Sequence, residues 1–201
     1  MFFLLLITTF TFHNRGAAVQ GFVEMPSNPP RAVVLYFHRY VEKGDSIAVW
    51  AQGLTPRGYA IASFTTIPTP DPVGLANGAV AGLRMQPGLE STPLVAVGTS
   101  MGSLTAAQYF AANSDVKALV LIVPGSTQIC TFLEHAKGRP VFLIQADQDE
   151  VTYGSGAEIR KCMTGNGKQL ILNGASHIFP PEAVTGEIAN WLDTLNFTSG
   201  N

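Results

Sequence analysis

The sequence predicts an α/β fold: a mostly parallel sheet with helices on both faces and an antiparallel hairpin at its N-terminal edge. Near-continuous apolar runs recur along the chain, and helix-prone segments separate them, as in a parallel sheet built from βαβ units. Hydrophobic residues make up 46% of the 201 residues and charged residues only 13%. This charged share is about half the usual one, so we expect a large buried core. A chain of this length predicts a single domain over residues 1–201.

The first element is expected to be the hairpin. Residues 9–12 alternate polar and apolar, Asn14-Arg15-Gly16 favours a turn, and residues 17–23 would form the return strand. The alternative is a signal peptide that begins in the apolar residues 1–7, which the lack of a preceding Lys or Arg disfavours. A short leader before the first strand would combine the two interpretations. The apolar run is too short to span a membrane, so we expect no stable membrane insertion.

The remaining elements alternate in type along the chain. Apolar runs predict strands at residues 32–37, 59–64, 93–97, 116–123, 140–145 and 168–172. Helices are predicted at residues 45–57, with Asp45 or Ser46 as the cap, and at 73–85, 103–110, 127–137, 156–163 and 181–195.

Composition disfavours several classes of function. The net charge is −2 and no basic cluster exists, which argues against a nucleic-acid partner. Cys130 and Cys162 are too few for a disulfide framework or a zinc site. We expect two buried thiols, with a disulfide between them as the alternative. No cluster has metal-ligand spacing and no phosphate-binding loop occurs, so neither a metal nor a cofactor is expected. A cytoplasmic location is favoured, unless the N-terminal run is a signal peptide that directs secretion.

Residues 94–102, Leu-Val-Ala-Val-Gly-Thr-Ser-Met-Gly, are the most informative stretch of the chain. An apolar run ends in a glycine-flanked serine, and a helix-prone segment follows at once, which is typical of a nucleophile elbow. Gly98 and Gly102 lack a Cβ atom, so the strand and the helix can approach closely around Ser100. Ser100 is therefore the candidate nucleophile. The alternative is an ordinary serine in a glycine-rich turn.

A serine hydroxyl becomes a useful nucleophile only beside a base, and the base needs an orienting acid. Acidic residues follow the predicted strand at 140–145, and His177 follows the predicted strand at 168–172. Loops at the carboxyl ends of parallel strands share one edge of the sheet. We therefore expect Ser100, one of the acids and His177 to converge.

These residues together resemble the α/β-hydrolase family, and in particular its uncapped serine esterases and dienelactone-hydrolase-like members. The stretch from Gly98 to Gly102 resembles the family's G-x-S-x-G elbow, and the order serine, acid, histidine matches the family's order. Residues 174–179, Gly-Ala-Ser-His-Ile-Phe, resemble its histidine loop. The resemblance covers essentially the whole chain. It implies the α/β-hydrolase fold, with His177 as the catalytic base.

The resemblance also selects among the acids. Family members commonly carry the acid in a G-x-x-D-x-V-like loop after a strand. Here Ala146 stands at the glycine position and Asp149 at the acid position. Asp149 is therefore the expected third member of the triad, with Asp147 as its rival and Glu150 as a third candidate. A helix cap for the segment that follows is the alternative role of Asp149.

An oxyanion hole is implied less directly. The family often has His-Gly-x after its third strand, and this chain has His38-Arg39-Tyr40. The resemblance places the two backbone donors at Tyr40 and Met101. Arg39 replaces the usual glycine, and it either adds positive charge near the site or lies in solvent. We expect His38 to brace this loop, and the other histidines, His13 and His135, to be exposed.

The resemblance implies a serine carboxylic-ester hydrolase that cleaves a small-molecule ester through an acyl-enzyme. Only residues 124–139 separate two neighbouring strands, which leaves space for one helix and predicts an open site without a cap domain. One alternative is a non-catalytic binding protein of the same fold, which Arg39 favours. An acyltransferase or thioesterase using the same triad is another. Nothing in these patterns specifies an oligomeric state.

Overall fold

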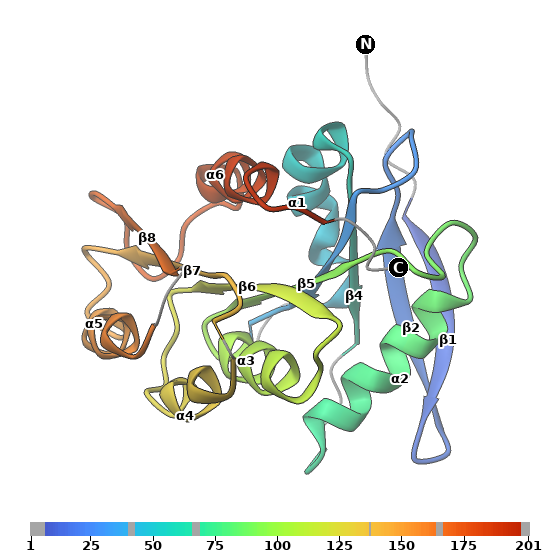
Figure 1. Ribbon diagram of the computed structural model, residues 1–201, viewed down its shortest axis with the longest axis horizontal. Coiled ribbons are helices and arrows are strands. Elements are labelled where there is room, and N and C mark those ends of the chain that lie inside the picture. The colour runs from blue at the N-terminus through green and yellow to red at the C-terminus, as the bar shows by residue number, and fades with distance from the viewer. Residues whose placement is uncertain (1–6, 40–42, 66–68, 137, 164–166, 198–201) are drawn as a thin grey trace. The chain divides into compact units, whose positions relative to one another are not determined.

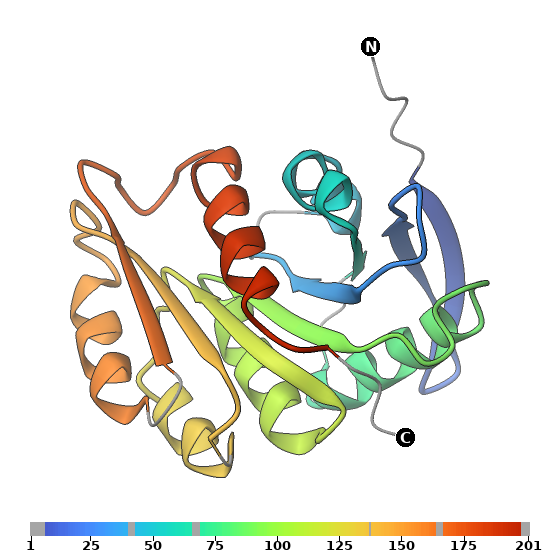
Figure 2. The same cartoon turned by 45° about the horizontal axis from the view of Figure 1, so that its top comes forward.

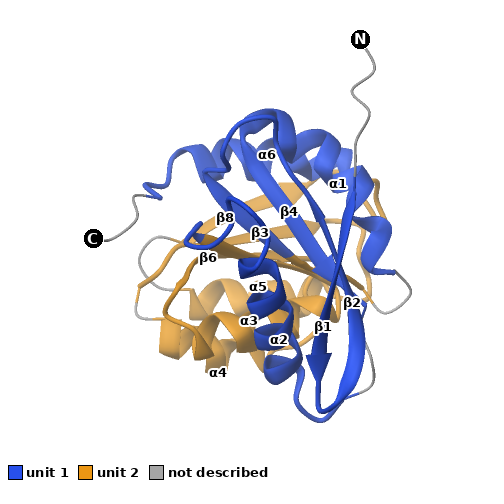
Figure 3. Ribbon diagram, turned by 90° about the vertical axis from the view of Figure 1, so that its right-hand side faces the viewer, with its two compact units in different colours: residues 1–35, 42–93, 181–201 blue, residues 36–41, 94–180 orange. Residues whose placement is uncertain are grey.

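The structure, a computed structural model, describes residues 7–39, 43–65, 69–136, 138–163 and 167–197 (Figure 1). Its eight strands form a mostly parallel sheet with an antiparallel hairpin at the N-terminus, which is the predicted fold class. The chain divides into two compact units, residues 1–35, 42–93 and 181–201, and residues 36–41 and 94–180 (Figure 3). The single domain expected from the chain length stays a prediction.

The first unit holds β1, β2, β4 and most of β3, in the spatial order β1-β2-β4-β3. Both pairings of β2, with β1 and with β4, are antiparallel, whereas β3 and β4 are parallel. The strands are β1 (Thr8–Asn14), β2 (Ala17–Glu24), β3 (Ala32–Phe37) and β4 (Tyr59–Phe64). The helices are α1 (Ile47–Leu54), α2 (Pro72–Arg84) and α6 (Glu182–Asp193), and 3-10 turns at Gly44–Ser46 and Thr55–Arg57 flank α1.

The hairpin prediction is confirmed, and its turn explains why. Arg15 and Gly16 connect the strands with φ angles of 50° and 83°, so both lie in the left-handed region. Two such residues match the right-handed twist of the strands on either side. The alternative of a signal peptide depends on residues 1–6, which lie outside the described residues.

Helices cover both faces of β2, as the sequence predicts. A Cβ atom on Gly82 of α2 would lie 3.0 Å from the ring of Phe10, and one on Gly44, just before α1, would lie 2.7 Å from the ring of Phe22. Phe10 pairs with Gly21 and so shares its face of the hairpin. Successive residues of a strand alternate between faces, so Phe22 projects from the opposite one. α2 therefore packs against one face of the hairpin, and the segment around Gly44 before α1 packs against the other.

The second unit is a run of parallel strands in the order β5-β6-β7-β8. They are β5 (Leu94–Thr99), β6 (Val116–Ile122), β7 (Val141–Ala146) and β8 (Gly167–Leu172). Figure 2 shows the three helices on one face of these strands: α3 (Gly102–Ala112), α4 (Ile129–Leu133), continued by the 3-10 turn Glu134–Ala136, and α5 (Tyr153–Cys162). Because all four strands run the same way, the loops after β5, β7 and β8 leave from one edge.

The expectation of two free thiols is wrong. Cys130 of α4 and Cys162 of α5 form a disulfide, with their Cα atoms 5.4 Å apart. Both residues are half-buried. The two helices lie side by side, and this proximity cannot be read from a pair of cysteines separated by 32 positions.

The expected cap of α1 is also absent. Ser46 precedes the helix, but its own backbone is helical and its hydroxyl makes no capping bond. Asp45 lies inside the 3-10 turn that begins at Gly44. No helix among the described residues has both the length and the apolar character needed to cross a membrane.

Candidate active site

The turn between β5 and α3 has the backbone of an elbow. Ser100 sits there with a φ of 53°, a left-handed conformation that costs a residue with a side chain about 1 kcal/mol or more. A Cβ atom on Gly98 would lie 2.5 Å from the Gly102 carbonyl oxygen, and one on Gly102 only 2.1 Å from the Phe37 carbonyl oxygen. Both glycines are therefore required by the close approach of backbone to backbone, as the sequence predicts.

Hydrogen bonds on both sides of Ser100 hold this strained turn. The Ser100 amide donates to the Ile122 carbonyl at 2.8 Å, which ties the turn to the end of β6. Ser103, fully buried in the first turn of α3, donates its hydroxyl to the Gly98 carbonyl at 2.7 Å. The sequence did not reveal this role of Ser103, since a serine at a helix start is common.

His177 lies beside the serine. Its Nε2 atom is 3.0 Å from Ser100 Oγ, and its side chain is 25% exposed. The loop that carries it after β8 is braced from the loop after β7, because Asp147 accepts the Gly174 amide at 2.7 Å and the Gln148 amide donates to Ala175 at 2.9 Å. Asp147, the rival acid, thus supports the histidine loop.

Asp149 is the acid that contacts the histidine. His177 Nδ1 lies 2.8 Å from Asp149 Oδ2, and the Asp149 side chain is fully buried. Asp149 Oδ1 accepts the backbone N–H groups of Val151 and Thr152, each at 3.0 Å, and Oδ2 also accepts the Thr152 hydroxyl. Asp149 therefore contacts His177 and also holds the two backbone amides that precede α5, whose own cap residue is Thr152. Glu150, the third candidate, is exposed.

The surroundings of Asp149 keep its carboxyl ionised. Burial raises its pKa, but hydrogen bonds from the Thr152 hydroxyl, from His177 and from the Thr152 amide lower it by more. The pKa of Asp149 therefore lies below its ordinary value. A buried carboxylate is tolerated here because Val151, Thr152 and His177 all donate hydrogen bonds to it.

Thr152 is the residue of this site that sequence reasoning missed. It is 4% exposed and touches both oxygens of the Asp149 carboxylate. An acid followed three positions later by a threonine at a helix start was the available signal. Such a pattern is also common at helix caps that carry no chemistry.

The two predicted oxyanion donors differ in status. Met101 follows Ser100 directly at the start of α3, and its side chain is 65% exposed. Tyr40 lies outside the described residues. The preceding loop does reach the elbow, because the carbonyl oxygens of Phe37 and His38 lie next to Gly102. His38 Nδ1 lies 2.9 Å from the carbonyl oxygen of Arg39. The Arg39 residue is half-buried.

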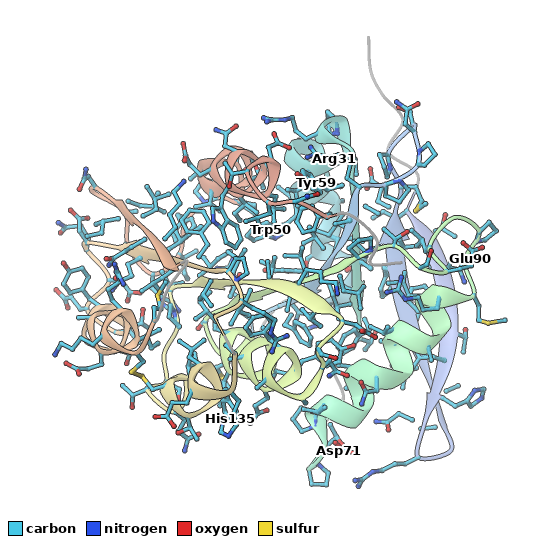
Figure 4. The ribbon with its side chains drawn as sticks, in the orientation of Figure 1. Arg31, Trp50, Tyr59, Asp71, Glu90 and His135 are labelled. Carbon is cyan, nitrogen blue, oxygen red and sulfur yellow. A yellow bond between two sulfur atoms is a disulfide. The ribbon has the colours of Figure 1, made fainter. Side chains whose placement is uncertain are left out.

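The other two histidines are exposed, as expected. His13 lies on β1, and His135 lies at the surface near α4, with Nδ1 2.9 Å from the Thr131 carbonyl oxygen (Figure 4). Within the described residues, no group of three or more histidine, cysteine, aspartate or glutamate side chains is arranged to hold a metal ion.

Comparison with known proteins finds matches among solved structures only. No family profile matches the sequence, and no curated protein matches it. Solved structures do match. The dienelactone hydrolase of Anabaena variabilis has a TM-score of 0.79 at 18% identity, over 94% of this chain and 97% of its own. The esterase domain of a Rhodothermus marinus protein has a TM-score of 0.78 at 16% identity, over 93% and 98%. Est1E of Butyrivibrio proteoclasticus has a TM-score of 0.77 at 15% identity, over 92% of this chain and 97% of its own. The chain therefore has the fold of the α/β-hydrolases.

Proposed function

We propose that this chain is a serine hydrolase that cleaves small carboxylic esters through an acyl-enzyme. The observation that carries the proposal is the continuous hydrogen-bonded chain from Ser100 through His177 to the buried Asp149. Esterases and a dienelactone hydrolase among the structural neighbours support the same reaction class. Fold alone would not choose a reaction, so the proposal depends on the site.

In the proposed reaction, Ser100 Oγ attacks the ester carbonyl carbon while His177 Nε2 takes the hydroxyl proton. The tetrahedral intermediate collapses, the bond to the alcohol oxygen breaks, and the imidazolium returns the proton to that oxygen. Water then attacks the acyl carbonyl carbon while His177 Nε2 takes a proton from it. The bond to Ser100 Oγ breaks, the imidazolium returns the proton to Oγ, and the carboxylic acid leaves. Asp149 holds the imidazole in the tautomer that leaves Nε2 free to accept, and it stabilises the imidazolium that forms.

The developing oxyanion needs donors that are already in place. The proposed donors are the backbone amides of Met101, at the start of α3, and of Tyr40, which the resemblance to the α/β-hydrolases implies and which lies outside the described residues. Loss of one such donor in serine hydrolases costs about 3–4 kcal/mol of transition-state stabilisation. The position of Met101 as the residue that directly precedes α3 supports its part, because helix N-termini favour negative charge.

Exposed apolar side chains next to the triad support an ester with an apolar acyl or alcohol group. Met101 follows the serine, Val151 lies two positions after the acid, and Ile178 follows the histidine. They are 65%, 78% and 70% exposed, respectively. Large apolar side chains left in water near one catalytic centre are typical of a binding surface.

The Ser100→Ala variant tests the mechanism. It should lose at least about a thousandfold in kcat towards p-nitrophenyl esters while its melting temperature stays near that of the wild type, because only the nucleophile is removed. Ser91→Ala, the same change at an exposed loop serine, is the matched control and should keep full activity.

A fluorophosphonate probe separates this proposal from the binding-protein alternative. Wild-type protein should be labelled at Ser100, and labelling should disappear in Ser100→Ala. Folded wild-type protein that takes up no label and turns over no ester would favour the non-catalytic alternative. Ester turnover that survives in Ser100→Ala would remove Ser100 from the mechanism.

A further inference from the structure

We propose that Thr152 is a positioning residue, whose hydroxyl fixes the Asp149 carboxylate so that it can orient His177 during turnover. This inference rests on the proposed function. It assigns to Thr152 a part in the reaction, whereas its side chain makes no capping bond to α5.

The first argument is the geometry of the carboxylate. Asp149 Oδ1 is held by two backbone amides, those of Val151 and Thr152. Oδ2 is shared between the Thr152 hydroxyl and His177 Nδ1. The amides fix one oxygen, but the plane of the carboxylate is fixed only when the second oxygen is also held. The Thr152 hydroxyl supplies that bond independently of whether His177 is charged.

The second argument is burial. Thr152 is 4% exposed and the Asp149 side chain is fully buried, so bulk water is poorly placed to replace a lost hydroxyl. A carboxylate oxygen that loses a donor in such a place bears an uncompensated desolvation cost. The carboxylate would then either turn toward another donor or hold a proton more readily. Both outcomes disturb the bond to His177.

The third argument concerns the charge of the Asp149 carboxylate. The Thr152 hydroxyl donates to Asp149 Oδ2, and this bond helps to hold the pKa of Asp149 below its ordinary value in spite of its burial. Removing the hydroxyl should therefore raise the pKa of Asp149. The charged carboxylate that orients His177 would then be retained only at higher pH.

The test compares Thr152→Val, which keeps the shape and removes the hydroxyl, with Thr152→Ser, which keeps the hydroxyl. Thr152→Val should lose about tenfold in kcat with KM changed less than about twofold, because Thr152 is only 4% exposed. The acid limb of its kcat/KM profile should move up by about half to one pH unit. Thr152→Ser should restore the wild-type limb and stay within about threefold of the wild-type kcat.

Two results would overturn the inference. One is a Thr152→Val enzyme with the kcat and acid limb of the wild type. The other is an equal loss in both variants with an unmoved acid limb, which is what a purely structural threonine would give. If Thr152→Val does not fold, Thr152→Ala takes its place against Thr152→Ser under the same criteria. Failure of the proposed function itself looks different, because Ser100→Ala would then stay active.

Discussion

Among the described residues, two carboxylates, those of Asp149 and Glu24, are almost completely buried, and their surroundings shift their pKa values in opposite directions. Asp149 has donors on both oxygens, and its pKa is lowered. Glu24, at the end of β2, is 1% exposed, and neither of its carboxylate oxygens has a hydrogen-bond partner among the described residues. Burial therefore raises the pKa of Glu24. Residue type alone would not have distinguished them.

Glu24 should make the stability of the protein depend on pH. Because its pKa is higher in the native state than in the unfolded chain, the native state holds this proton to higher pH. The Glu24 contribution to the free energy of unfolding is then greatest at low pH. It falls as pH rises from the unfolded pKa of about 4.3 through the native one, by up to about 1.4 kcal/mol per pH unit. Glu24→Gln should remove this decline, since an amide does not titrate.

The measurement is urea denaturation between about pH 4 and pH 8, a range that spans the unfolded pKa of glutamate. The advantage of Glu24→Gln over the wild type should grow as pH rises. Glu90→Gln, at an exposed loop position (Figure 4), is the matched control and should run parallel to the wild type. Parallel curves for Glu24→Gln as well would show that the buried carboxyl does not control this slope.

At the scale of elements, α5 is held at both ends. The residues just before it carry the contacts between Asp149 and Thr152, and its last residue, Cys162, is joined to Cys130 of α4. A disulfide stabilises mainly by limiting the unfolded chain, and a separation of 32 residues corresponds to about 3–4 kcal/mol in the chain-entropy account.

Replacing both cysteines by serine should therefore lower the free energy of unfolding by about 3 kcal/mol. Urea denaturation of the double variant and of the wild type, each with and without reductant, measures this. Reductant should shift the wild type towards the double variant and leave the double variant unchanged. Equal midpoints for the oxidised wild type and the double variant would contradict the expected stabilisation.

The elements differ in how far their residues specify them. β3 and β4 begin and end where the sequence predicts, because continuous apolar runs with clear boundaries define buried strands. α5 begins at Tyr153, three residues earlier than predicted. Its start depends on the Asp149 carboxylate, which accepts the amides that precede the helix. Intrinsic helix propensity did not predict this earlier start, because Gly154 and Gly156 disfavour a helix there.

For the whole molecule, the fold class and the convergence of Ser100, Asp149 and His177 could be predicted. A glycine-flanked elbow and loops at one edge of parallel strands leave few alternatives. The disulfide could not be predicted, because it depends on which helices become neighbours. The contact of Thr152 with Asp149 could not be predicted either, because an acid followed three positions later by a threonine is also common at helix caps without chemistry. The disulfide also gives information about the cellular compartment of the protein.

Disulfides persist mainly in oxidising surroundings. The disulfide between Cys130 and Cys162 therefore favours the secreted alternative over the cytoplasmic one.

The exposed apolar residues beside the triad lead to a prediction about substrate length. If Met101 and Ile178 contact the acyl chain, kcat/KM should rise along p-nitrophenyl esters from acetate to octanoate. A fully buried methylene contributes about 0.8 kcal/mol, so a partly covered one should give about a twofold rise per methylene. Met101→Ser and Ile178→Ser should each flatten this slope, because each variant removes apolar surface that only a longer acyl chain would cover. Met85→Ser is the matched control, since Met85 is 82% exposed at the end of α2, away in sequence from the triad. A slope that stays the same in both site variants would mean that the acyl chain leaves the serine in another direction.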